Sequence, residues 1–367
     1  MMRFDNIFQG MPFRWMVYST FLGIATAIHS SPSVTVDPSL YPSGFSISNS
    51  AVEELVSKQA ASFLQLNDQA GTLSRYANAS TVTTRATASD YMSDIELYSV
   101  GFAVATGSGL SGKSFSDLDG NNFNFDNGVP SVGFAIHTSA QIGVNLGAFT
   151  RKKISAVDLS KMSVFVSFFD LSIPAVSGSN FRFNSGHFAL SAQYLIFDGK
   201  KWIPYKVLQW SGLYLGSGLH YTSFDFVLNK GARITATDST NGYSAYFETS
   251  SEIPYVMRTF TIPFEAATNI RLLYLLTIMA GGALDFNFGS AYSNSSINAD
   301  VILNQAGTDT KVGTISNSQT DSKSPDTIGL RAFLGLQTHF GPVKVYSVIN
   351  YDTAAAFGVQ VGFRFAR

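Results

Sequence analysis

Cysteine is absent from the 367 residues of this chain, and charge is scarce. Without cysteine, disulfides, thiolate metal sites and cysteine nucleophiles are excluded, and a chain that crosses an oxidising compartment unfolded cannot mispair. Charged residues make up only 13 %, about half the usual share of soluble domains. The formal net charge of −1 lacks the basic excess on which nucleic-acid binding depends. We therefore expect no nucleic-acid partner.

The chain also lacks a long apolar run of the kind that forms a membrane-spanning helix, which needs ~18 or more residues. A shorter apolar stretch, Met16–Ile24, follows Arg3 and Arg14 and precedes Ala25-Thr26-Ala27. These are the n-region, h-region and A-x-A cleavage site of a secretory signal. The sequence predicts a cleaved signal peptide over 1–27, with a buried N-terminal helix of a cytosolic protein as the alternative.

Aromatic residues and glycine are abundant, at 31 Phe, 16 Tyr and 31 Gly. Low charge combined with many aromatics and glycines suits a tightly turned β protein that faces lipid. A soluble protein of this composition would be difficult to keep dispersed.

From about Glu96 onward, apolar residues alternate with small or polar ones at a period of two, the pattern of a β-strand. The alternation is unbroken from Val132 to Ala148, longer than the ~9–11 residues with which a tilted strand crosses a bilayer. It recurs over 328–340, 343–351 and 357–365. Because a bilayer offers no water to a free strand edge, such strands must close. We predict an all-β fold, a closed antiparallel transmembrane β-barrel of about 10–12 strands over 95–367, with one N-terminal amphipathic helix.

That helix is predicted within a lead-in segment, 28–94. Ser50 and Glu53 form a capping box, and the apolar residues that follow share one helical stripe, namely Val52, Leu55, Val56, Phe63 and Leu66. The spacing predicts a helix over 51–66. We expect it to pack on the barrel rim, with a plug inside the lumen as the alternative. Residues 77–90, rich in Ala, Ser and Thr, are predicted as a flexible connection.

The polar face of the strands is predicted to line the lumen. Its candidate residues are His137, Gln141, Asn145, Arg271, Asp285, Arg331 and Gln337. The segment 270–288, interpreted as one strand, places Arg271 and Asp285 on this inner side. Two longer polar stretches, 107–130 and 290–327, are predicted as outer loops.

The first of these loops contains two motifs. Gly107–Ser114 matches the P-loop pattern GxxxxGK[ST], but the residues after it read as loop, whereas bound phosphate needs a helix N-terminus there. We interpret the match as chance.

Four oxygen-bearing residues follow in the same loop: Asp117, Asp119, Asn121 and Asp126. Their spacing resembles the start of a calcium loop, yet the sixth position is Asn122 and not Gly, and the twelfth is Gly128 and not Glu. We expect a solvated turn, with a calcium site as the alternative and no other cofactor. The five histidines lack metal-ligand spacing, and no GxSxG elbow occurs. We expect no enzymatic activity.

Two runs, Gly186–Tyr194 and Gln209–Gly218, resemble segments of leptospiral outer-membrane surface proteins. Together with the C-terminal strands, the likeness covers about half of the chain. The near-terminal Phe365 also resembles the assembly signal of bacterial outer-membrane barrels, although Ala366 and Arg367 trail it. The resemblance implies an adhesin-like surface barrel that binds host extracellular-matrix and plasma proteins, and it implies no site residue.

Three functions stay open. The first is a surface-exposed barrel in the outer membrane, partnered by its lipid, whose outer loops bind host macromolecules. The second is a channel for small solutes or lipophilic compounds, with the 51–66 helix as a hatch and the inner-face candidates along the path. The third is a secreted soluble β protein.

Overall fold

The computed structural model describes residues 28–29, 33–41, 50, 53–54, 69–84, 90–93, 95–110, 132–150, 153–154, 157–173, 181–201, 207–238, 243–305 and 308–367. The predicted signal peptide over 1–27 lies outside these residues. So do the calcium candidates Asp117, Asp119, Asn121 and Asp126. Of the helix predicted over 51–66, only Glu53 and Glu54 are described, and both are helical.

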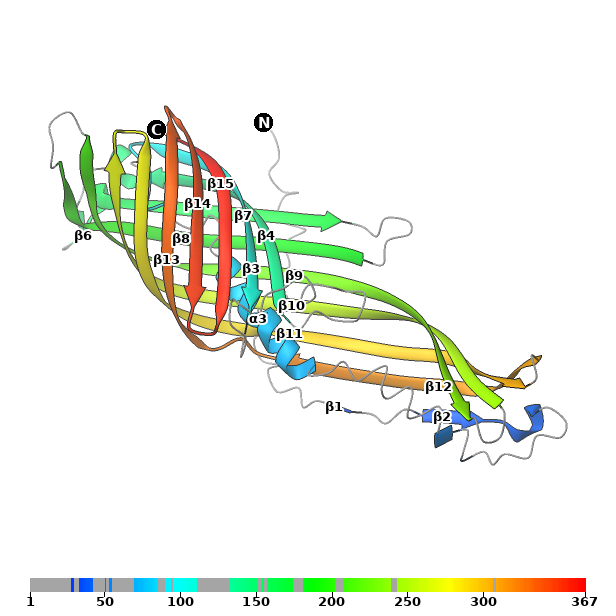
Figure 1. The fold of residues 1–367 in the computed structure, drawn as a ribbon. Helices are drawn as coiled ribbons and strands as arrows, with labels where there is room; N and C mark the ends of the chain where they lie inside the picture. The colour runs from blue at the N-terminus through cyan, green and yellow to red at the C-terminus, as the bar shows by residue number, and fades with distance from the viewer. Residues whose placement is uncertain are drawn as a thin grey trace, which may run out of the picture.

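Within the described residues, ten antiparallel strands close into a barrel (Figure 1). They are β3 (Tyr98–Gly109), β4 (Gly133–Asn145), β7 (Met162–Ile173), β8 (Phe181–Lys201), β9 (Leu208–Asp238), β10 (Tyr243–Leu272), β11 (Leu276–Gln305), β13 (Ile328–Phe340), β14 (Val343–Asp352) and β15 (Ala356–Ala366). The last strand, β15, pairs with β3, and β13 pairs with the first half of β11. The predicted closed barrel and its strand number are confirmed.

The two faces of the wall differ in chemistry as the alternation predicts. In β13, Leu330 and Leu334 are 60 % and 56 % exposed, whereas Arg331 and Gln337 between and beyond them are buried. Large exposed apolar side chains recur on the outer face of all ten barrel strands. Such a continuous apolar surface is unfavourable in water and matches the outward apolar band of a transmembrane barrel.

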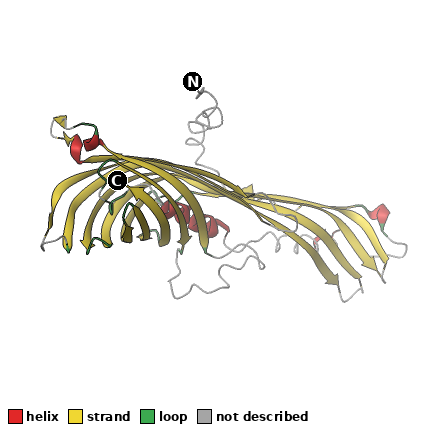
Figure 2. Ribbon diagram, turned by 90° about the horizontal axis from the view of Figure 1, so that it is seen from above, coloured by secondary structure: helices red, strands yellow, loops and turns green. Residues whose placement is uncertain are grey.

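Three strands continue far beyond the barrel wall (Figures 1 and 2). β9, β10 and β11 have 31, 30 and 30 residues, about three times the ~9–11 that cross a bilayer. Beyond the barrel, β11 exchanges its partner β13 for β12 (Thr308–Lys323). We call this part the distal sheet: residues 229–238, 243–252, 291–305 and 308–323. The short strands β1 (Ile28–His29) and β2 (Ser33–Val36) pair with the outer edge of β12, and the 3₁₀ turn η3 (Pro38–Leu40) follows.

The prediction of an outer loop over 290–327 is therefore wrong for most of that stretch. Its Asn, Ser and Thr residues alternate too weakly with apolar ones to indicate a strand. The ladder between β11 and β12 runs from Ala291↔Lys323 to Gln305↔Thr308 and supplies the pairing that the sequence does not show.

The segment 270–288, predicted as one strand, is a hairpin instead. β10 ends at Leu272 and β11 begins at Leu276, and the turn between them places Leu273 and Tyr274 at φ of 51° and 62°. Positive φ is uncommon for such side chains, so the apolar composition concealed the turn. Because Arg271 pairs with Thr277 across the turn, the two strands still share one inner face.

A small folded connection joins β4 and β7 at the end of the barrel where the C-terminus of the chain lies. It contains the 3₁₀ turns η6 (Leu146–Ala148) and η7 (Leu159–Lys161) and the two-stranded sheet of β5 (Lys153–Ile154) and β6 (Val157–Asp158). The carboxylate of Asp158 accepts a hydrogen bond from the Ser160 backbone N–H at 3.0 Å and begins η7.

Helix α3 (Gln69–Thr83) lies under the arch of strands (Figure 2). Its apolar residues Leu73 and Tyr76 and its polar residues Asn78 and Ser80 are all buried. The predicted flexible connection over 77–90 is therefore wrong for its first part. A helix that is buried on every side shows no amphipathic stripe, which is why the periodicity did not indicate it. In the part of the chain that the structure describes, no helix has the length and hydrophobicity that a membrane span requires.

Candidate functional site: the filled lumen and the distal sheet

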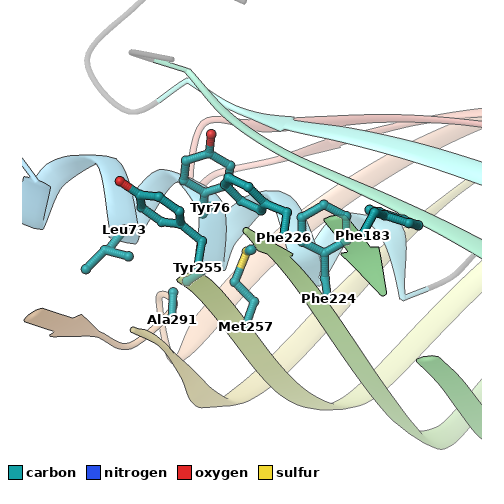
Figure 3. Packing of buried hydrophobic residues seen from close by; sticks show 9 residues of the cluster. Leu73, Tyr76, Phe183, Phe224, Phe226, Tyr255, Met257 and Ala291 are labelled. Carbon is teal, nitrogen blue, oxygen red and sulfur yellow. The ribbon is translucent and has the colours of Figure 1, made fainter. Parts of the chain in front are cut away.

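An aromatic cluster anchors α3 to the inner wall (Figure 3). The ring of Tyr76 lies 5.2 Å from that of Phe226, 5.3 Å from Phe134 and 5.8 Å from Tyr255, measured between centroids. Phe226 and Tyr255 stack at 4.7 Å. Aromatic pairs at these separations add ~0.5–1.5 kcal/mol each beyond area burial. Burial raises the pKa of the Tyr76 hydroxyl well above its usual value, so this side chain is neutral.

Glycines make room for the helix. A Cβ at Gly107 would lie 2.6 Å from the Ala79 carbonyl oxygen, and Cβ atoms at Gly109 and Gly133 would collide with the backbone of Arg75. Each of the three positions lies on β3 or β4. Gly107 and Gly109 belong to the P-loop-like pattern, and in the structure they bring the wall against a helix backbone.

Polar contacts fix the position of α3 along the wall. The Ser80 hydroxyl lies 3.2 Å from that of Thr222 and 3.0 Å from that of Thr259. Asn78 accepts a hydrogen bond from the Asp326 backbone N–H at 2.9 Å. Since Asp326 lies between β12 and β13, α3 is bonded to the point where the barrel gives way to the distal sheet.

A second element of the lumen is the segment 90–93, which follows the helix. Tyr91 donates a hydrogen bond to Glu265 at 2.7 Å, and the Tyr91 carbonyl accepts one from Asn269 at 2.5 Å. Gln193 donates to the Asp90 carbonyl at 2.9 Å. We call α3 and residues 90–93 together the plug.

A buried charge cluster lies beside the plug. Arg331 forms ion pairs with Glu265 at 2.5 Å and Asp285 at 2.8 Å, with side-chain exposures of 2 %, 6 % and 4 % respectively. Asn350 accepts a further hydrogen bond from the Arg331 guanidinium at 2.7 Å. The planar guanidinium therefore satisfies three acceptors in one arrangement. Through Glu265, the cluster is connected to Tyr91 of the plug.

A second ion pair joins the plug to the other side of the wall. Arg364 pairs with Asp90, and the guanidinium lies over the Tyr346 ring at 3.9 Å from its centroid. Ser93 donates to Gln337 at 3.2 Å, and Gln337 in turn lies 3.2 Å from the His339 ring nitrogen. Four strands thus hold residues 90–93: β8, β10, β13 and β15.

The structure places the sequence-predicted lumen residues as follows. His137, Gln141, Asp285, Arg331 and Gln337 face the interior and are buried. Asn145 lies at the end of β4, where it accepts the Gly147 backbone N–H at 2.8 Å and donates to the Ile95 carbonyl at 2.7 Å. Arg271 lies beside the hairpin turn, half-buried, 3.4 Å from the Thr277 hydroxyl. Of these residues, Asp285 and Arg331 are brought into direct contact.

Sequence reasoning missed the other members of the cluster. Alternation along the strands is the signal that could have placed Glu265 and Arg364 inside. No sequence signal shows that Asp90 and Tyr91 enter the barrel, because they follow neither a periodic strand nor an amphipathic helix.

Little space is left beside the charge cluster. The cavity between Tyr91, Met92, Arg331 and the surrounding wall measures about 30 Å³, enough for on the order of one water. The described plug residues and the inward side chains that contact them, among them Tyr76, Tyr91, Arg331 and Arg364, are buried.

The distal sheet has a polar face. Cross-strand partners on β11 and β12 are Asn294↔Thr320, Ser296↔Ser318, Asn298↔Ser316 and Asp300↔Thr314. All eight side chains are exposed. Apolar residues between them, among them Val301, Leu303 and Ile315, are buried. The result is a row of hydrogen-bonding side chains beyond the barrel. Seven of the eight are uncharged, and the eighth, Asp300, forms an ion pair with Lys311 at 2.7 Å.

These observations define the class of protein: a transmembrane β-barrel whose lumen is filled by its own N-terminal region. The chain belongs to the Lsa36-like family, whose model matches residues 39–367. The family takes its name from a leptospiral surface protein, which agrees in kind with the resemblance found in the sequence.

No curated protein matches the chain. Among solved structures, it is similar to LpxR from Salmonella typhimurium, with 10 % identity, 73 % of this chain and 100 % of that chain covered, and a TM-score of 0.25. It is also similar to Omp33 of Acinetobacter baumannii, with 11 % identity, 74 % of this chain and 99 % of that chain covered, and a TM-score of 0.23. A Pseudomonas aeruginosa FadL homologue shares 9 % identity, with 73 % of this chain and 89 % of that chain covered and a TM-score of 0.20. Likeness at these scores says nothing about the function of this chain.

Proposed function

We propose that the protein is an outer-membrane surface protein in which a plugged barrel anchors the distal sheet, and that the polar face of that sheet binds a host macromolecule. The observation that carries this proposal is the length of β9, β10 and β11, which continue beyond the wall as a paired sheet with an exposed Asn/Ser/Thr face. Exposed amides and hydroxyls supply adaptable hydrogen bonding at recognition surfaces.

Topology supports the orientation. The short turns 273–275 and 341–342 lie at the same end of the barrel as the C-terminus, because Leu276 pairs with Thr338 and Phe365 with Val343. In outer-membrane barrels short turns face the periplasm and longer connections face outward. The distal sheet is at the opposite end, together with the short turn 353–355, and the longer β4–β7 connection lies at the end of the C-terminus. The proposal places the distal sheet outside the cell because β9, β10 and β11 continue beyond the wall only at that end.

Epitope accessibility tests the orientation. An epitope inserted between β11 and β12 should be labelled by antibody on intact cells. The matched control is the same epitope between Gly341 and Pro342, which should be labelled only after permeabilisation. The reverse pattern, or labelling of neither site on intact cells, would contradict the proposal.

Binding to immobilised extracellular-matrix and plasma proteins tests the polar face. The pair Asn298→Ala with Ser316→Ala removes one cross-strand row, and we expect binding to weaken. Lys153→Ala, exposed at the opposite end, is the control and should bind as the unaltered protein does. If the unaltered protein binds none of the panel, the binding role is rejected.

A gated channel is the second candidate function. It is favoured by one observation, that residues 90–93 are held to four strands by polar and ionic contacts alone, with no covalent cross-link between them and the wall. Planar-bilayer recordings distinguish the two candidates. The variant that lacks residues 69–93 should conduct and shows that the barrel has inserted. An unaltered protein that stays silent at every applied voltage beside this variant supports the anchor. Current from the unaltered protein supports the channel.

A further inference from the structure

The barrel wall has a gap in its hydrogen-bond ladder between β4 and β7. The ladder that joins these strands ends at Ala140↔Phe168. Beyond that pair, residues 133–139 of β4 still pair with β3, and residues 169–173 of β7 still pair with β8. Both stretches are described in full, and no ladder joins them. We call these two stretches the seam, which lies at the end of the barrel nearer the distal sheet.

At the seam, β4 packs against the inner face of β8 and β9. Phe134 has the same parity as Ile142, which is 51 % exposed on the outer face of β4. The Phe134 ring nevertheless lies 5.6 Å from that of Phe224 and 5.3 Å from that of Phe226, both buried and inward on β9. Tyr76 of α3 contacts Phe134 and Phe226 at 5.3 and 5.2 Å (Figure 3). The plug therefore packs against both sides of the seam.

Two histidines lie at the seam, one on each side. Ser185 of β8 donates its single hydroxyl proton to the Ile136 carbonyl of β4 at 3.0 Å. The Nδ1 of His137, 2.9 Å from the same hydroxyl oxygen, must therefore be the donor to it. The Nε2 of His137 and both ring nitrogens of His187 have no hydrogen-bond partner among the described residues. Each neutral ring thus keeps one nitrogen that can take up a second proton.

The surroundings do not compensate a charge on either ring. His137 and His187 are 0 % and 4 % exposed, and the two rings act on each other electrostatically. Carboxylates of the flanking strands project from the outer face instead: Asp170 is exposed, and Asp225 is paired with Arg258. Among the described residues, no carboxylate acts on either ring.

The other titratable groups on the packed elements supply no negative charge. On α3 these are the Arg75 cation, which donates to Thr72 at 3.1 Å, and the neutral Tyr76. On β9, the Nδ1 of His220 lies 3.2 Å from the Thr84 carbonyl oxygen. Arg182 of β8 is exposed on the outer face. A second proton on both seam histidines would therefore bury two like charges without a counterion, which is strongly unfavourable.

We propose that the seam is an acid-sensitive switch, in which protonation of His137 and His187 separates β4 from β8 and frees α3 from the wall. Once separated, the rings meet water, where an imidazole binds a proton near pH ~6.5. Below that pH the open state binds one more proton per ring than the closed state, so acid favours opening by up to ~tenfold per pH unit for each ring. Above pH ~7 neither state gains a proton, and the seam stays closed. The proposal does not rest on the binding role of the distal sheet.

Thiol labelling of α3 tests the switch, because the chain has no cysteine of its own. Ser80→Cys puts one thiol at a position of the helix that is 0 % exposed. The full chain in phospholipid vesicles is labelled with a pyridyl disulfide reagent at a series of pH values from ~7.5 to ~4.5, on both sides of the imidazole range. Each rate is divided by that of Thr314→Cys on the exposed face of the distal sheet, which cancels the pH dependence of the thiol itself.

We expect this ratio to be constant above pH ~7 and to rise below ~6.5, approaching ~hundredfold per pH unit for two rings. Ala77→Cys, also 0 % exposed on α3, should give the same profile. A ratio that does not change with pH overturns the proposal. So does loss of the gel mobility of the folded barrel over the same pH range, because the whole barrel and not the seam would then respond to acid.

Histidine variants identify the sensor. His137→Asn, which keeps a donor for Ser185, and His187→Leu should each reduce the slope to ~tenfold per pH unit, and the double variant should remove it. His220→Asn and His339→Gln are the matched controls, since both rings are buried and inward but lie outside the seam; each should keep the steep profile. A slope unchanged in both seam variants, or flattened by either control, overturns the proposal. If a variant does not fold, the profile of the chain with all five histidines still decides.

Discussion

Replacement of Arg331 by methionine is the perturbation for which the structure gives the sharpest expectation. The side chain is 2 % exposed and neutralises two carboxylates, Glu265 and Asp285, that are themselves 6 % and 4 % exposed. The substitution keeps most of the volume and removes the cation that both carboxylates contact. Removing one partner of a buried ion pair costs ~3–5 kcal/mol, because the remaining charge is buried without compensation. We expect Arg331→Met to lower the free energy of unfolding by about this amount.

A neutral version of the cluster separates charge from packing. Arg331→Met combined with Glu265→Gln and Asp285→Asn leaves no uncompensated charge, and fully replaced buried ion clusters are often near neutral in stability. We expect this triple variant to lie within ~1–2 kcal/mol of the unaltered protein. The double variant Glu265→Gln with Asp285→Asn keeps the charge of Arg331 but neutralises both carboxylates that it pairs with, and we expect it to be destabilised as well.

The assay is equilibrium unfolding in urea from phospholipid vesicles, followed by tryptophan fluorescence and by the gel mobility of the folded barrel. Trp210 lies on β9 and donates to Thr268 at 2.7 Å, so its emission reports on the wall. A single variant as stable as the unaltered protein would refute the reasoning. A triple variant no better than the single one would show that packing of the guanidinium, and not its charge, stabilises the lumen.

Three further predictions concern the plug and the outward apolar band of the barrel. Tyr76→Ala should cost ~3–5 kcal/mol in the same urea assay, as expected when a large buried ring is removed; a loss below ~1 kcal/mol would mean that the cluster repacks. Gly133→Leu should displace α3, because a side chain there meets the backbone of Arg75, and a protease added to vesicles should then cut between 69 and 83 while the barrel stays intact; resistance to cleavage contradicts the close approach. Leu334→Arg should lower the free energy of unfolding in vesicles by ~2–4 kcal/mol, and an unchanged stability would argue against the position of Leu334 in the outward apolar band.

The period-two alternation is sufficient to predict the barrel. A strand with one face in hydrocarbon and one in a packed lumen must alternate, so residues such as Leu330 and Arg331 reveal their faces from the sequence. The length of the alternating stretches indicates that the strands cross a bilayer. Closure follows because the backbone groups of a free strand edge find no hydrogen-bond partner inside a bilayer. The inward direction of Asp285, Arg331 and Gln337 follows from this alternation. The even strand number follows from antiparallel pairing all round a closed wall.

Three features depended on tertiary structure. α3 is buried on every side, so its sequence 69–83 has no stripe to detect, and its position depends on glycines 107, 109 and 133 that lie far away in the chain. The distal sheet is made of Asn- and Ser-rich sequence that resembles a loop, and only pairing between β11 and β12 makes it a strand. The contact of Asp90 and Tyr91 with β10 and β15 joins residues far apart in sequence, and no local pattern encodes such a contact. Local periodicity fixes which way each strand faces, whereas the filling of the lumen depends on which distant surfaces fit together.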